Sequence, residues 1–94
     1  MTEIVVVAQP NGTFRVDVRS DGSATTHVVS VPAGYLAALG CDDVPTEQLI
    51  QASFLFLLER EPPNSILRRF RLDQIADYFP DYPSTIGQRL RSRD

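Results

Sequence analysis

The single histidine, His27, is the residue of this chain best suited to acid–base or metal chemistry. Imidazole changes its charge near neutral pH and is a common metal ligand. Catalysis would also need a nucleophile or a carboxylate in reach, yet no cysteine or carboxylate stands at ligand spacing from His27. Its place in an alternating segment favours a buried imidazole held by a hydrogen bond. We therefore expect no catalytic residue, and an enzyme with a His27-centred site is the least supported function.

Pairs of carboxylates are a second source of acid–base chemistry. Two carboxyl groups can divide the roles of acid and base when burial separates their pKa values. The pairs in this chain are Asp42-Asp43, Asp73/Asp77 and Asp77/Asp81. We interpret all three as solvated, because they stand in a turn, on an exposed helix face and around a proline. The chain also has no Gly-rich phosphate loop and no HExxH, GxSxG or CxxC motif, so we expect no cofactor and no metal.

Cys41 is the one cysteine, so no intrachain disulfide can form. A lone thiol suits a reducing compartment. The two acids that follow it would raise the pKa of the thiol, which argues against a reactive cysteine. No apolar run approaches the roughly 20 residues that span a bilayer, and no basic segment typical of a signal peptide begins the sequence. We therefore expect a cytoplasmic protein that does not contact membranes.

Arginines supply all nine basic side chains, and they gather in the C-terminal half. One group is Arg60, Arg68, Arg69 and Arg71, and a second ends the chain at Arg89, Arg91 and Arg93. Guanidinium groups suit phosphate or carboxylate partners, so these arginines and His27 form a candidate interaction surface. A nucleic-acid-associated regulator is the alternative function that they suggest, and an acidic protein is another possible partner. The net charge of −3 and the acids of residues 72–79 argue against nucleic acid.

A β-hairpin is expected to position His27. Apolar residues alternate with charged ones from Phe14 to Val18, which is typical of a half-buried strand. Asp21-Gly22 favours a type I′ turn, and a two-residue loop then places His27 opposite Val16. The predicted buried face consists of Phe14, Val16, Val18, Thr25, His27, Val29 and Val31. A bulge in the turn would reverse this assignment.

The β-branched run Ile4–Ala8 predicts a further strand, which completes a three-stranded antiparallel β-meander. If helices cover one face of this small sheet, Val5 and Val7 point to the other face. An exposed valine strand invites pairing with a second copy or with a partner. The best hypothesis is therefore a non-enzymatic protein–protein interaction module that forms a homo-oligomer through its N-terminal strand.

The C-terminal half is expected to be helical. A short helix over residues 33–39 should end at Gly40, and a longer helix should run from residue 47 to about residue 60. From Phe54 to Leu58 that helix is apolar all round, so we expect it to be buried on every side. Two short helices, over residues 65–70 and 72–79, would cover it. The sequence thus predicts one α+β domain over residues 1–83, followed by a mobile, Arg-rich tail over residues 84–94.

The middle of the chain resembles a family of small bacterial proteins of unassigned function. The residues that carry the resemblance are Ser53 to Pro62, Ser65-Ile66-Leu67, Phe70, Ile75 and Tyr78-Phe79-Pro80, with Thr26 to Val29 in the hairpin. The resemblance covers most of the chain and implies a free-standing bacterial cytoplasmic protein. It carries no activity, cofactor or catalytic residue over to this sequence.

Overall fold

Three antiparallel strands form the N-terminal half of the computed structural model, which describes residues 2–92. They are β1 (Thr2–Ala8), β2 (Thr13–Ser20) and β3 (Ser23–Ser30), and they pair in sequence order. The turn between β2 and β3 has positive φ angles at Asp21 (48°) and Gly22 (86°), as a type I′ turn requires. The Asp-Gly dipeptide therefore predicted this turn correctly.

The register of the hairpin agrees with the sequence prediction. Val16 pairs with His27, and Val18 pairs with Thr25. Because side chains alternate along a strand, this register sends Val16, Val18, Thr25, His27 and Val29 to one face, where all five are buried. Phe14 and Val31 are half-buried on the same side.

The sheet has a fourth strand that the sequence did not predict. Strand β4 (Arg69–Arg71) runs parallel to β3, so the sheet is mixed and has the order β1-β2-β3-β4. The prediction of a three-stranded antiparallel meander was therefore incomplete, and the helix expected over residues 65–70 was wrong. A 3₁₀ turn at Pro63–Ser65 leads into β4 instead. The chain extends because Phe70 fits the inner face of the sheet while its two arginine neighbours stay exposed.

Helix α2 (Thr46–Leu58) is the central element that the sequence predicted. Its buried residues are Leu49, Ile50, Ser53, Phe54, Phe56 and Leu57, and Pro62 and Pro63 follow its end. The expectation that the helix is buried on every side was wrong at one position. Leu55 is 46% exposed, so the helix keeps one narrow face toward solvent.

Three further helices complete the fold. Helix α1 (Tyr35–Ala38) lies between β3 and α2 and is followed by Gly40, which has a φ of 75°. Helix α3 (Ile75–Tyr78) follows a 3₁₀ turn at Leu72–Gln74, and helix α4 (Tyr82–Ser92) comes last. The expected polar tail over residues 84–94 is corrected by α4, because Ile86 and Leu90 are buried core residues. Arg93 and Asp94 lie outside the described residues.

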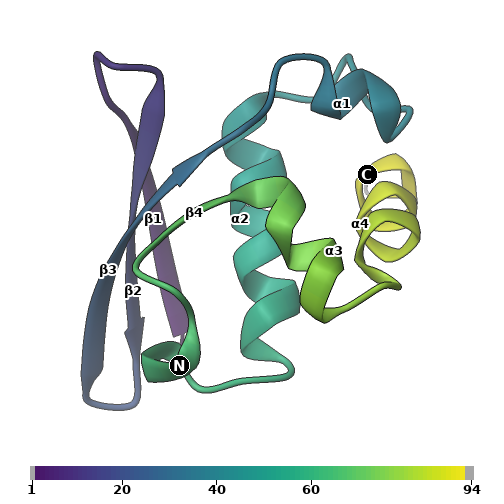
Figure 1. Ribbon diagram of the computed structural model, residues 1–94. Helices are drawn as coiled ribbons and strands as arrows, with labels where there is room; N and C mark the ends of the chain where they lie inside the picture. The colour runs from purple at the N-terminus through teal and green to yellow at the C-terminus, as the bar shows by residue number, and fades with distance from the viewer. Residues whose placement is uncertain (1, 93–94) are drawn as a thin grey trace.

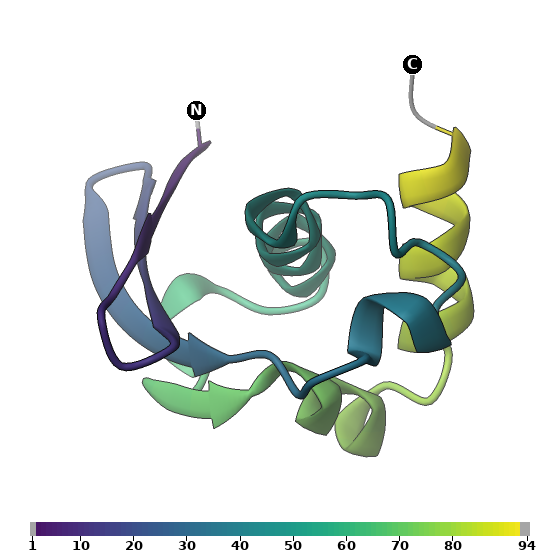
Figure 2. The ribbon, with the colours of Figure 1, turned by 90° about the horizontal axis from the view of Figure 1, so that it is seen from above.

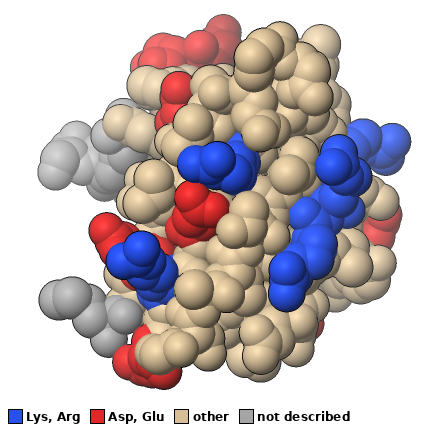
Figure 3. All heavy atoms as spheres, turned by 90° about the vertical axis from the view of Figure 1, so that its left-hand side faces the viewer, with Lys and Arg blue, Asp and Glu red and all other residues tan. Residues whose placement is uncertain are grey.

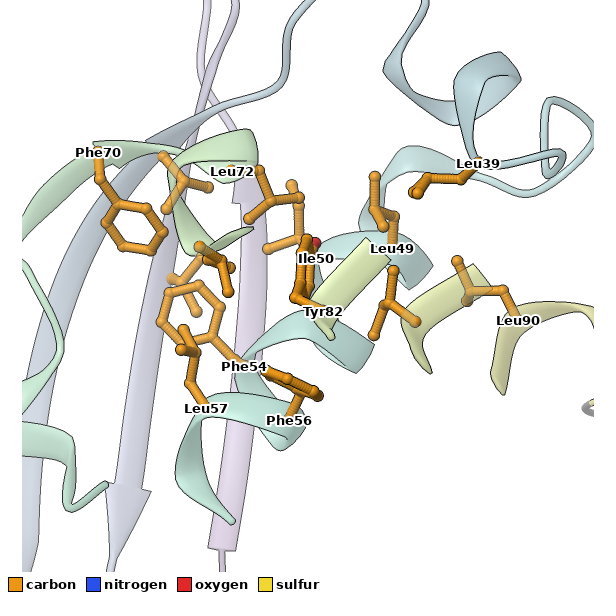
Figure 4. Packing of buried hydrophobic residues seen from close by; sticks show 14 of the residues in the cluster. Leu39, Leu49, Ile50, Phe54, Phe56, Leu57, Phe70, Leu72, Tyr82 and Leu90 are labelled. Carbon is orange, nitrogen blue, oxygen red and sulfur yellow. The ribbon is translucent and has the colours of Figure 1, made fainter. Parts of the chain in front are cut away.

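These elements form layers around one hydrophobic core. The sheet, α2 and α4 follow one another when the molecule is viewed from above, and all helices lie on the same side of the sheet (Figure 1, Figure 2). Helix α4 contributes Tyr82, Ile86 and Leu90 to the core, and Figure 4 shows Tyr82 and Leu90 on this helix. The helical cover predicted for two short helices over residues 65–70 and 72–79 is therefore shared by α4. Within residues 2–92, no helix lies over the opposite face of the sheet. This small α+β domain therefore presents one open sheet face, and its two edge strands are the seven-residue β1 and the three-residue β4.

Candidate functional site

His27 is completely buried in the core and uses both ring nitrogens for structural hydrogen bonds. Its Nδ1 lies 2.8 Å from the carbonyl oxygen of Leu67, and its Nε2 lies 2.9 Å from the hydroxyl of Thr25. The ring also contacts Phe54, with 5.3 Å between ring centroids. In this arrangement Nδ1–H donates to the carbonyl, and Nε2 accepts from the hydroxyl. His27 thus ties β3 to the segment that precedes β4.

The surroundings of His27 favour its neutral form. Burial lowers the pKa of its imidazole below 6.5, and the nearby charge of Arg68 lowers it further. The hydrogen bond to Leu67 and the charge of Asp17 act in the opposite direction but are weaker. The residue is therefore a neutral member of the core, as the alternating pattern predicted.

The predicted arginine surface is divided in the structure. Arg60 belongs to a cluster between the C-terminal end of α2 and the start of α4, where it pairs with Asp81 at 3.1 Å. Its guanidinium also lies 3.6 Å from the centroid of the Phe56 ring, a cation–π contact. Arg89 completes this cluster with two hydrogen bonds to Glu59, of 2.7 and 3.0 Å, which lower the pKa of that carboxyl. These contacts make Arg60 a residue that joins two helices.

Arg69 and Arg71 lie instead on the open face of the sheet. Arg69 continues the row in which Val7, Arg15 and Val28 are paired across β1, β2 and β3. Figure 3 shows basic side chains gathered along one side of this face. Arg71 pairs with Asp73 at 3.1 Å. Arg68 and Arg69 have no ion pair among the described residues, so they are the two members of the predicted set left free for another partner.

The remaining candidate residues are the paired carboxylates and Cys41, and they are exposed, bonded to arginine or buried. Asp42 and Asp43 are exposed in a turn. In the other two predicted pairs Asp73 is bonded to Arg71, Asp81 is bonded to Arg60, and Asp77 is exposed. The Cys41 thiol is buried, 3.6 Å from the carbonyl oxygen of Leu39, and lies under helix α4. No group of three or more potential metal ligands occurs within residues 2–92.

Strand β1 is the outer strand of the sheet and has no neighbour on its other side in the described part of the chain. It is seven residues long and contains neither proline nor lysine, two features that natural edge strands use to prevent pairing. Val5 and Val7 are 44% and 38% exposed on the open face, as the sequence predicted. Asp17 and Arg15 are their partners on β2.

The hydrogen-bonding direction of each β1 residue follows from the type I′ turn. In a two-residue hairpin the closing pair, here Ser20 and Ser23, is hydrogen-bonded, and the direction then alternates along the ladder. Odd-numbered residues of β1 therefore bond to β2, in agreement with the bond of 2.9 Å from the Gln9 N–H to the Thr13 carbonyl. The N–H and C=O groups that point to the open edge are those of Thr2, Ile4, Val6 and Ala8.

Two features of this region were missed by the sequence reasoning. Arg69, the arginine of the open face that has no ion pair within residues 2–92, belongs to β4. The only local signal for that strand is the alternation Arg69-Phe70-Arg71. Three residues are too few to distinguish a strand from a helix by period. The separation of Arg60 from Arg69 also depends on β4, because that strand returns the chain to the sheet.

Comparison with protein-family models, with curated proteins and with solved structures finds no match for this chain. The resemblance to small bacterial proteins therefore stays a prediction. Within residues 2–92, none of the helices combines the length and the apolar character needed to cross a membrane. The class of protein defined by the fold and the site is a small α+β domain with a mixed four-stranded sheet and an open edge strand.

Proposed function

We propose that this protein is a non-enzymatic interaction module that associates with a second copy of itself through β1. The observation that carries the proposal is the open edge of β1, where the backbone groups of four residues face outward beside two exposed valines. An unpaired strand edge offers hydrogen bonds to another strand, and apolar side chains next to it add contact area.

An antiparallel pairing of the two copies uses the whole strand. With full overlap, Val5 lies opposite Val5 of the second copy, and Ile4 lies opposite Val6 of the second copy. The outward-facing residues then meet in hydrogen-bonded pairs, and each half-buried apolar side chain meets another. This two-fold arrangement places the same surface of both copies in the interface, which is the commonest symmetry among homo-oligomers.

Replacing Val5 by lysine tests the proposal. The ammonium group of one copy would lie directly opposite that of the other across the interface, while the side chain stays solvated in the single domain. We expect the wild type to show a concentration-dependent dimer in sedimentation velocity. The Val5→Lys variant should have a dimer dissociation constant at least about tenfold higher than that of the wild type, which corresponds to the loss of about 1.4 kcal/mol.

The matched control is Leu55→Lys. Leu55 has an exposure similar to that of Val5, but it lies on α2 and not on the sheet edge. This variant makes the same kind of substitution and should leave the dimer unchanged. A wild type that sediments as a monomer at every concentration would refute self-association, and equal weakening by both substitutions would refute the assignment to β1.

A nucleic-acid-associated regulator stays the alternative, with narrower support than the sequence suggested. Arg60 and Arg71 form ion pairs within the chain, and so does Arg15, which leaves Arg68 and Arg69 without an ion pair within residues 2–92. Among the described residues, the open face also has no exposed aromatic ring on which single-stranded nucleic acids could stack. If this alternative holds, RNA or DNA binding should weaken steeply with salt and be lost when Arg68 and Arg69 become glutamine.

A further inference from the structure

A cavity of about 140 Å³ lies between the C-terminal end of α2, the segment before β4, and α3. Its inner wall is apolar and nearly inaccessible to solvent, and is formed by Leu57, Ile66, Phe70 and Ile75. Figure 4 shows Leu57 and Phe70 on this side of the core, approaching it from α2 and β4. Leu67 and Tyr78 also line the cavity and are 48% and 65% exposed, so they mark its open side.

One carboxylate borders this apolar cavity. Glu61 is half-buried in the wall, and its side chain has no hydrogen bond or ion pair within residues 2–92. Glu59, two residues earlier, is in contrast held by Arg89. A carboxylate beside apolar surface gains most from a cationic partner, because burial weakens its hydration and strengthens a charge-assisted hydrogen bond.

We propose that this cavity binds a small free amine that carries one aromatic or branched apolar group. The volume sets the size of the apolar group, because an apolar cavity of about 150 Å³ accommodates a benzene ring. The ammonium group would bond to Glu61, and the exposed ring of Tyr78 offers a second contact for a cation. The cavity holds only one ring, which favours a small molecule over a peptide segment. This inference does not depend on the pairing of β1.

The test compares three probes of nearly equal shape: 2-phenylethylamine, 2-phenylethanol and phenylacetate. Each is titrated into the full-length protein, and amide chemical shifts are followed by two-dimensional NMR. We expect the amine to bind more tightly than the alcohol by about tenfold, as loss of one charge-assisted hydrogen bond predicts, and phenylacetate to bind most weakly. The shifts should be largest at Ile66, Phe70 and Ile75.

Glu61→Gln should abolish the preference for the amine while the alcohol still binds. Glu47→Gln is the matched control, because Glu47 is an exposed acid at the other end of α2 and should not affect any probe. Absence of saturable shifts with all three probes would overturn the proposal. It would also be overturned if Glu61→Gln kept the amine preference, or if the shifts lay outside the cavity.

Discussion

At the scale of single residues, burial decides which candidate side chains keep a chemical role. His27 and Cys41 are the two side chains with intrinsic reactivity, and both are fully buried among structural partners. Arg60 is joined to an acid and an aromatic ring. Glu61, Arg68 and Arg69, in contrast, have no side-chain hydrogen bond or ion pair within residues 2–92. These side chains are not reactive groups, so a function that depends on them would be the binding of a partner of complementary charge and shape.

The neutral state of His27 predicts a pH-dependent stability. Its pKa in the folded protein lies below 6.5, whereas the unfolded chain titrates near 6.5. Above pH 6.5 both states are neutral at this residue and the free energy of unfolding is constant. As the pH falls from 6.5 toward the folded pKa, only the unfolded state gains the proton, so stability falls by at most about 1.4 kcal/mol per pH unit.

Urea unfolding between pH 7.5 and 5 measures this effect, and His27→Gln is the comparison. Glutamine has no titration in this range, and its amide can bond to the Leu67 carbonyl. The variant should be less stable overall but independent of pH over the same window. If the wild type shows no loss of stability below pH 6.5, the imidazole is not held neutral by the core.

Tyr82 offers a second test at this scale. Its hydroxyl lies 2.6 Å from the Ser53 hydroxyl, which also donates to the Leu49 carbonyl, and both side chains are fully buried. Tyr82→Phe removes one buried hydrogen bond between α2 and α4. We expect it to lower the free energy of unfolding by about 1 kcal/mol. Tyr78→Phe, at an exposed position, should have no measurable effect.

At the scale of elements, the predictable parts were those with a repeating local pattern. Strand alternation and the Asp21-Gly22 turn determine the hairpin register, and the apolar positions of α2 follow the helical period. Strand β4 was missed because its formation depends on the parallel contact with β3, which no local pattern encodes. Helix α4 was missed because its apolar residues stand four apart among polar ones in an arginine-rich segment.

The candidate site was predictable to a smaller extent. The exposure of Val5 and Val7 followed from strand alternation together with helices on one face. The separation of Arg60 from Arg69 could not be predicted, because the two residues are close in sequence. They lie apart because Arg69 is in β4, which pairs with the sheet, whereas Arg60 follows the end of α2. The apolar cavity beside Glu61 is formed by residues of α2, β4 and α3 and of the segments between them, so it has no signature in any one element.

Ile86→Ala tests whether α4 is an integral layer of the fold. The Ile86 side chain is fully buried in the hydrophobic core. Removing three of its carbon atoms should lower the free energy of unfolding by about 2–5 kcal/mol. Gln88→Ala is the control, because Gln88 is exposed on the same helix and should change stability by less than about 0.5 kcal/mol. Equal stability of the two variants would mean that residues 84–92 do not stabilise the domain.

At the scale of the whole molecule, helices cover one face of the sheet and leave the other face and the β1 edge open (Figure 2). Antiparallel pairing of two β1 strands would join the two sheets into one, with both open faces on the same side. The arginines of β4 would then form two separate groups, one at each outer end of the joined sheet. Self-association and binding of an acidic partner on the open face are therefore compatible.

Amide hydrogen exchange in β1 as a function of protein concentration is the direct test of pairing through the β1 edge. The Ile4 and Val6 amides face the open edge, whereas those of Val5 and Val7 bond to β2 and serve as internal controls. Pairing with a second copy predicts that Ile4 and Val6 are protected at high concentration and lose protection on dilution, while the controls stay protected. Fast exchange at Ile4 and Val6 at every concentration would show that β1 does not pair with a second copy.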